Sequence, residues 1–156
     1  MTDPQSIAPG HPLIARVLIT DPQNRVLLVH TVGSRPRWGL PGGLVTLSES
    51  PRAADRRAIA EELGLTVEVG DLLATEWTPA HTPGRRARLT LTFIGPSLAR
   101  ADIARIVLQD SEVDALEWAD RTRAATVLHL CIAPVVGFPL AMPLNTRYLE
   151  SSPETS

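Results

Sequence analysis

The segment Gly43–Leu65, which reads GLVTLSESPRAADRRAIAEELGL, decides how the whole sequence is interpreted. Either Ser48 or Ser50 can cap a helix, and Pro51 fits the first helical turn because its missing N–H would have no partner there. Alanine-rich sequence follows, and Gly64 is a natural stop because glycine adopts the left-handed conformation without strain. The segment therefore predicts a helix that begins near residue 50 and ends at Gly64.

The C-terminal half of this predicted helix carries two adjacent carboxylates, Glu61 and Glu62. Such a pair by itself is typical of a solvated helix end, but acidic side chains there oppose the helix dipole, and a bound cation would relieve that opposition. Arg57 lies one turn before Glu61 on the same face and can hold its carboxylate. Gly43 can bring a backbone carbonyl close to an ion because it has no Cβ. Oxygen donors of this kind suit Mg²⁺, so these residues predict a divalent-cation site.

The spacing of these residues resembles the Nudix box, G-x5-E-x7-R-E-U-x-E-E-x-G-U, in which U is an apolar aliphatic residue. Eight of the nine specified positions match, and Trp38–Gly43 looks like the family's usual lead-in. The resemblance implies hydrolysis of a pyrophosphate bond in a nucleoside diphosphate linked to another moiety, or in a related nucleotide. It implies Mg²⁺ as the cofactor, with Mn²⁺ as a substitute. It also implies catalytic roles for Glu49, Arg57, Glu61 and Glu62, and metal ligation by Gly43, Glu61 and Glu62.

The one departure from the box is Ala58, which stands where the family has a glutamate that ligates metal or helps to activate water. Three interpretations are open. Glu61 and Glu62 hold a working metal together with a carboxylate from elsewhere in the chain. Alternatively Asp55 acts through water. It lies seven residues before Glu62, on nearly the same helical face, and about 10 Å from it along the helix axis. In the third, the chain is a catalytically weakened Nudix-fold module that binds or regulates without cutting a nucleotide.

A carboxylate from outside the box is the first substitute to consider, because family members often place a ligand or base late in the chain. Glu112 opens a predicted strand, and Glu117 precedes a tryptophan near the end of that strand. Both are candidate metal ligands, although solvation at the surface is the more ordinary role for either.

Substrate recognition is predicted from two arginine-containing segments. Arg35 and Arg37 flank a proline just before the glycine-rich lead-in, and arginine is well suited to phosphate. A second group lies in the loop between two predicted strands, where specificity often resides. Its members are His81, Arg85 and Arg86. An ordinary solvated surface is the competing interpretation for both segments.

The rest of the chain alternates between strand patterns and one further helix. The period-two alternation of Arg88–Phe93 is the clearest strand signal. A sequence of strands with one helix in the middle and one near the end indicates an α/β (α+β) fold, and the resemblance implies a Nudix-type α/β/α sandwich with a mixed sheet. The predicted strands are Leu13–Thr20, Arg25–Thr31, Leu44–Leu47, Leu72–Thr78, Ala87–Ile94 and Val113–Trp118, and the last helix is Thr122–Cys131.

Composition limits the class of protein. A length of 156 residues suits a single domain, with loose tails at about 1–12 and 150–156. A net charge of −2 without a basic field argues against nucleic acid as a partner, which leaves a small nucleotide-type molecule. One cysteine and the absence of a long apolar run predict a cytoplasmic protein without a membrane span. A homodimer is suggested by the family resemblance alone.

Overall fold

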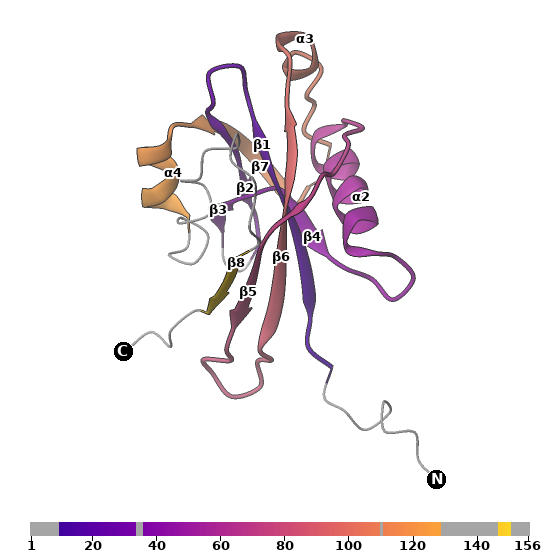
Figure 1. The fold of residues 1–156 in the computed structure, drawn as a ribbon, viewed down its shortest axis with the longest axis vertical. Coiled ribbons are helices and arrows are strands. Elements are labelled where there is room, and N and C mark those ends of the chain that lie inside the picture. Colours follow the sequence, from indigo (N-terminus) through magenta and orange to yellow (C-terminus); the bar gives the residue numbers. More distant parts are fainter. Residues whose placement is uncertain (1–9, 34–35, 110, 129–146, 151–156) are drawn as a thin grey trace.

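The computed structural model describes residues 10–33, 36–109, 111–128 and 147–150, which form a mixed β-sheet with helices on both sides (Figure 1). The helices among these residues are α2 (Pro51–Leu63), α3 (Arg100–Ile103) and α4 (Arg121–Val127). The strands are β1 (Leu13–Thr20), β2 (Val26–Thr31), β3 (Arg37–Gly39), β4 (Gly42–Leu44), β5 (Leu72–Thr78), β6 (Arg88–Ser97), β7 (Val113–Ala119) and β8 (Arg147–Glu150).

Strand pairing makes β1 the centre of the sheet. The hydrogen-bonded order is β3-β2-β1-β6-β5-β8, while β4 pairs with β1 and β7 pairs with β2. β1 runs parallel to β6, and β5 runs parallel to β8, whereas the other pairs are antiparallel. β1 and β2 pair only at Thr20 and Val26, so the hairpin between these two consecutive strands is short, and β6 is the long partner of β1. The predicted mixed sheet is confirmed.

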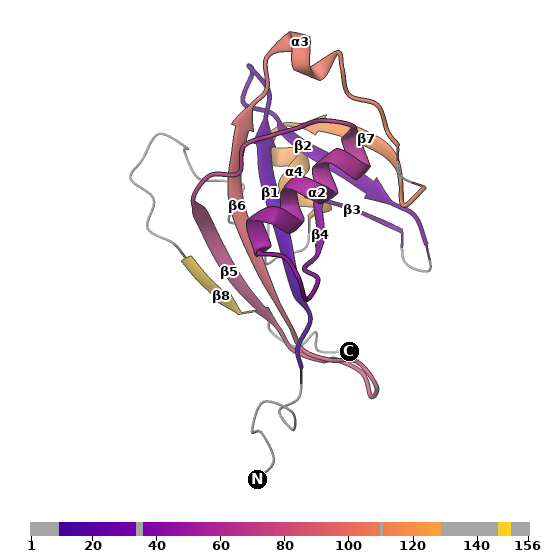
Figure 2. The same cartoon turned by 90° about the vertical axis from the view of Figure 1, so that its right-hand side faces the viewer.

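The two faces of the sheet are covered by different helices. Alternate residues of β1 point to opposite faces, so Ala15 and Val17 pack with Ile59 of α2, whereas Leu18 packs with Ala124 of α4. In Figure 2, α2 lies in front of the sheet and α4 behind it. This arrangement is the predicted α/β/α layering.

Helix α2 begins and ends where the sequence indicates. The Ser50 hydroxyl oxygen accepts a hydrogen bond from the Ala53 N–H at 3.2 Å, and Pro51 is the first helical residue. Gly64 closes the helix with a φ of 67°, a left-handed conformation that favours glycine. These two ends fix the helical register that positions the carboxylates of the box.

The predictions for two segments were wrong. The glycines and prolines of Trp38–Gly43 predict an irregular, tightly turned segment, but β3 and β4 form on either side of Leu40 and Pro41. The extended segment expected at Leu44–Leu47 begins earlier, since pairing with β1 places β4 at Gly42–Leu44. The final helix, α4, ends at Val127, and Cys131 lies outside the described residues. No helix in the described part of the chain is long and apolar enough to cross a membrane.

Candidate functional site

The side chain of Arg57 connects α2 to the loop before it. Its Nε and Nη2 donate to the two carboxylate oxygens of Glu49 at 3.0 and 2.7 Å, and its Nη1 donates to Glu61 at 3.1 Å. Nη2 also donates to the carbonyl oxygen of Leu44 at 3.1 Å. One guanidinium therefore fixes the end of β4, the loop and the C-terminal half of the helix together.

The contacts between Arg57 and Glu49 keep both side chains charged. The hydrogen bonds from Arg57 lower the pKa of Glu49 to about 2, and the same contacts raise the pKa of Arg57. Glu49 also accepts from the Thr46 N–H at 3.1 Å. Because both oxygens of Glu49 are engaged, its geometry is that of a residue that positions Arg57, whereas Glu61 remains half exposed.

Glu62 lies against the paired strands β1 and β4. The residue is 8% exposed, and one of its carboxylate oxygens is 3.4 Å from the Gly42 N–H. Gly42 has a φ of +142°, and a Cβ there would come within 2.2 Å of the Ala15 carbonyl oxygen. Glycine at this position is therefore required for β4 to approach β1, and that approach brings Glu62 to the backbone of the lead-in.

Ala58, the departure from the box, faces the same strand. It is 3% exposed, and its Cβ lies 3.7 Å from where a Cβ on Gly43 would stand. A glutamate at position 58 would therefore place its side chain at the contact between α2 and β4, beside the Gly43 backbone that is predicted to hold a metal.

Asp55 lies one turn before Ala58 and is completely buried. Neither of its carboxylate oxygens has a hydrogen-bond partner among the described residues. Burial raises the pKa of Asp55 to about 8, opposed by the charge of Arg16 and reinforced by that of Glu62. A buried carboxyl group without partners is costly, so its presence calls for an explanation.

The two late carboxylates occupy different places. Glu117 accepts hydrogen bonds from Arg123 of α4 at 2.8 and 3.2 Å, which lower its pKa. Its neighbours Leu116 and Trp118 pack toward the α2 side, so Glu117 lies on the opposite face of the sheet from α2. The structure does not bring it to Glu61 and Glu62.

Glu112 follows a segment that contacts the C-terminus of α2. The Val107 N–H donates to the Leu63 carbonyl at 3.0 Å, and the Gln109 N–H reaches the Glu62 carbonyl at 3.4 Å. Glu112 is three residues beyond Gln109, a separation that the chain spans in at most about 11 Å. Of the two late candidates, Glu112 is therefore the one whose location is compatible with the α2 carboxylates.

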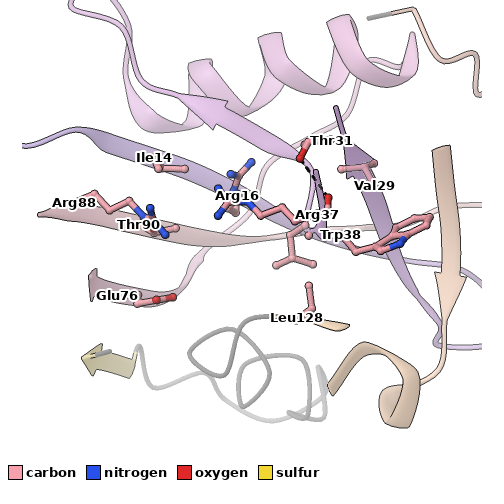
Figure 3. A pocket seen from close by; sticks show the side chains of 12 residues that line it. Ile14, Arg16, Val29, Thr31, Arg37, Trp38, Glu76, Arg88, Thr90 and Leu128 are labelled. Atoms are coloured by element: carbon pink, nitrogen blue, oxygen red, sulfur yellow. Dashed lines mark hydrogen bonds between the residues drawn. The ribbon is translucent and has the colours of Figure 1, made fainter. Parts of the chain in front are cut away.

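A pocket of about 240 Å³ opens on the α4 side of the sheet (Figure 3). Its wall includes three arginines, Arg16, Arg37 and Arg88, together with Glu76 and Leu128, which follows α4. Burial lowers the pKa of Arg16, whereas the charge of Glu62 acts in the opposite direction. Arg16 therefore belongs to the pocket wall and also interacts electrostatically with the α2 carboxylates.

An open groove of about 890 Å³ continues from this pocket. Arg37 and Arg88 line both spaces, and the groove also includes all three residues predicted in the loop, His81, Arg85 and Arg86. Arg35 lies outside the described residues. Sequence analysis missed Arg16 and Arg88, although a charged residue inside the apolar run of β1 was a signal that Arg16 has a special environment.

Comparisons with known proteins identify the family. The model of the NUDIX domain matches residues 10–134. A relative from Mycobacterium tuberculosis, named "Putative 8-oxo-dGTP diphosphatase 2", is 36% identical over 90 residues, which are 56% of this chain and 64% of the relative. An RNA pyrophosphohydrolase from Teredinibacter turnerae is 28% identical over 100 residues, which are 63% of this chain and 58% of the relative. The chain thus spans less than two thirds of the length of these relatives.

The same fold occurs in a crystal structure of a MutT NUDIX hydrolase from Burkholderia pseudomallei. The TM-score is 0.67 at 21% identity, and the match covers 82% of this chain and 97% of that one. The family model itself extends from before β1 to beyond α4 and includes the whole Arg57 group. The chain belongs to the Nudix domain family.

Proposed function

We propose that this chain is a Mg²⁺-dependent pyrophosphohydrolase that cuts a pyrophosphate bond in a nucleoside diphosphate linked to another moiety, or in a related nucleotide. The observation that carries the proposal is the adjacency of two groups. The carboxylates of α2 lie on one face of β1 and the arginine-lined pocket lies on the other, and Arg16 of the pocket wall interacts electrostatically with Glu62. A metal site beside an anion-binding pocket is what cleavage of a diphosphate requires.

The donor set fits magnesium. The backbone carbonyl of Gly43, the carboxylates of Glu61 and Glu62, and Glu112 as the late carboxylate would hold the ion. Among the described residues no three His, Cys, Asp or Glu side chains form a metal cluster, so backbone and water would complete the coordination, as Mg²⁺ commonly accepts. When bound, Mg²⁺ supplies neutralisation of the diphosphate charge and activation of water.

The chain's own residues would orient the reactants. Arg57 holds Glu61 and the loop in place through Glu49. Arg16, Arg37 and Arg88 would hold phosphate oxygens, because guanidinium groups bind them in pairs of hydrogen bonds. A water oxygen then bonds to one phosphorus atom as the bridging P–O bond breaks. The bridging oxygen stays with the departing phosphate, and the protons of the water are released.

The second candidate function is a nucleotide-binding or regulatory module with little or no turnover. Ala58 favours it, because alanine replaces a catalytic carboxylate at the α2–β4 contact. Metal-dependent nucleotide binding without product release would support this alternative.

The test is product release from a panel of nucleotide sugars, dinucleotides and (d)NTPs with Mg²⁺ or Mn²⁺. The panel includes 8-oxo-dGTP and RNA, which the names of the relatives suggest. Glu61→Gln and Glu62→Gln should each abolish most of the activity, whereas Glu68→Gln, an exposed acid outside α2, should preserve it. Activity that survives the first two substitutions would rule out this site. A single-domain organisation, a cytoplasmic location and a homodimer remain predictions from the sequence.

A further inference from the structure

Two buried aspartates in this protein differ in their hydrogen-bond partners. Asp21 is 0% exposed and accepts hydrogen bonds from the Gln23 N–H at 3.0 Å, the Arg25 N–H at 2.8 Å and the Arg25 Nε at 2.7 Å. Asp55 is also 0% exposed, yet both of its oxygens lack a hydrogen-bond partner among the described residues. Buried carboxyl groups rarely remain unpartnered in native proteins unless an ion or a water completes them. Asp55 is therefore a buried carboxyl group to which none of the described residues supplies a hydrogen bond.

The position of Asp55 on α2 indicates what that partner is. Asp55, Ala58 and Glu62 are spaced i, i+3 and i+7, so they share one helical face. All three are buried, and this face packs on β1 and β4. Ala58 contacts the Gly43 position, and Glu62 reaches the Gly42 N–H. Because Ala58 carries no carboxylate, Asp55 is the acidic side chain that accompanies Glu62 among these three residues.

The charges around Asp55 favour a divalent cation. Glu62 repels the Asp55 carboxylate, and Arg16 attracts it without donating a hydrogen bond to it. A small dication accepts several oxygen ligands and attracts both carboxylates at once, which a single guanidinium at a distance does not achieve.

We propose that Asp55 is a ligand of the divalent cation, directly or through one bound water, and that it replaces the carboxylate missing at Ala58. The cation lies at the contact of α2 with β4, between Glu62 and the Gly43 carbonyl. This inference rests on the metal site of the proposed function and assigns it a ligand that the Nudix box does not contain. Of the three interpretations of Ala58, this proposal is the second, in which Asp55 takes the place of the missing carboxylate.

The experiment measures Mn²⁺ affinity of the full chain, stripped of metal by chelation, by calorimetric titration. Asp55→Asn should weaken Mn²⁺ binding by about tenfold or more, the range found when a supporting ligand of a metal is lost. Asp55→Asn combined with Ala58→Glu should restore the affinity, because the carboxylate returns at the box position. Asp102→Asn, in a half-exposed acid of α3, is the matched control and should leave the affinity unchanged.

Thermal unfolding separates ligation from a structural role. In chelator, Asp55→Asn should unfold at the same temperature as the unmodified chain or higher, because it removes an unpartnered buried carboxyl group. In Mn²⁺, the rise in unfolding temperature should be smaller for Asp55→Asn than for the unmodified chain. If Asp55→Asn fails to fold, Ala58→Glu alone decides. A gain in Mn²⁺ affinity below about tenfold supports an already complete site, and a gain of tenfold or more overturns the proposal.

Equal Mn²⁺ affinity of Asp55→Asn and the unmodified chain overturns the assignment of Asp55. If the unmodified chain still binds Mn²⁺ and releases product, the proposed function survives that result. If the unmodified chain binds no Mn²⁺, both proposals fail together.

Discussion

The α2 face of the central sheet carries carboxyl groups at the site, whereas the α4 face carries guanidinium groups. On the α2 face, Glu62 and Asp55 are buried against β1 and β4. On the α4 face, Arg16, Arg37 and Arg88 surround a pocket. β1 contributes to both, because Ala15 packs toward α2 while Arg16 enters the pocket wall. Adjacent residues of β1, Ala15 and Arg16, therefore face the proposed metal site and the proposed phosphate-binding pocket, respectively.

This difference teaches that the two halves of the chemistry are supported in different ways. The α2 half is held by four hydrogen bonds of Arg57, which join it to Glu49, Glu61 and Leu44. The arginines of the pocket place three guanidinium groups around a space of about 240 Å³, and these groups would bind an anion. Substitutions should therefore impair turnover on one face and substrate affinity on the other.

Arg57→Ala is expected to have the largest effect on the α2 face. It removes the contacts to Glu49, Glu61 and Leu44 at once, so the carboxylates lose their fixed positions. Turnover and Mn²⁺ affinity should fall by about 10- to 100-fold. Steady-state kinetics and metal titration measure both quantities. Arg57→Lys should recover only part of the loss, because an ammonium group cannot hold Glu49 with two parallel hydrogen bonds. Full activity in Arg57→Ala would show that the contacts of Arg57 do not contribute to catalysis.

Arg16→Met tests the pocket. It removes one cation from the wall while keeping a side chain of similar length, so KM should rise by about tenfold, which is the value of one charge-assisted hydrogen bond. The turnover number should change less. Arg56→Met, on the exposed side of α2, is the matched control and should alter neither constant. A loss confined to turnover would contradict the separation of the two faces and would assign Arg16 to the metal group.

The local parts of this comparison could be predicted from the sequence. Helix α2, its cap at Ser50 and its end at Gly64 follow from short-range rules, and the Arg57–Glu61 contact follows from a spacing of four residues. These features depend on neighbours along the chain, so a pattern of residue types is enough to locate them.

The long-range parts could not be predicted in the same way. Glu117 was a reasonable ligand by sequence, but which face of the sheet it occupies depends on the register of β7 against β2, and Arg123 of α4 binds it there. The pocket likewise needs β1 and β6 side by side in parallel, which brings Arg16 and Arg88 together from distant positions. Sequence periodicity gives alternation of faces but not which strands become neighbours.

The metal-free protein should lose stability as pH rises, because of Asp55. The pKa of Asp55 is about 8 in the folded chain, above its ordinary value of 3.8, so the folded state retains a proton that the unfolded state releases between these values. Stability from this group is complete below about pH 4 and declines until about pH 8. The groups that face it are Arg16, which reduces the effect, and Glu62, which increases it. Chemical denaturation in chelator from pH 4 to 8 measures the slope, which should be flatter in Asp55→Asn. An unchanged slope in the variant would refute this origin.

The smallest effect is expected in the groove beyond the pocket. Arg85 and Arg86 are exposed and line only its outer part, whereas Arg37 and Arg88 line both spaces. Charges in contact with water are weakly coupled to a ligand and are screened by salt, so Arg85→Ala and Arg86→Ala should each raise KM by about two- to threefold at low ionic strength. The rise in KM should disappear in 0.5 M salt, because the Debye length is then only about 4 Å. Kinetics at two salt concentrations measure this. A tenfold loss that persists in salt would move substrate recognition from the sheet to the loop, and the pocket would then be an entry to the site and not its specificity element.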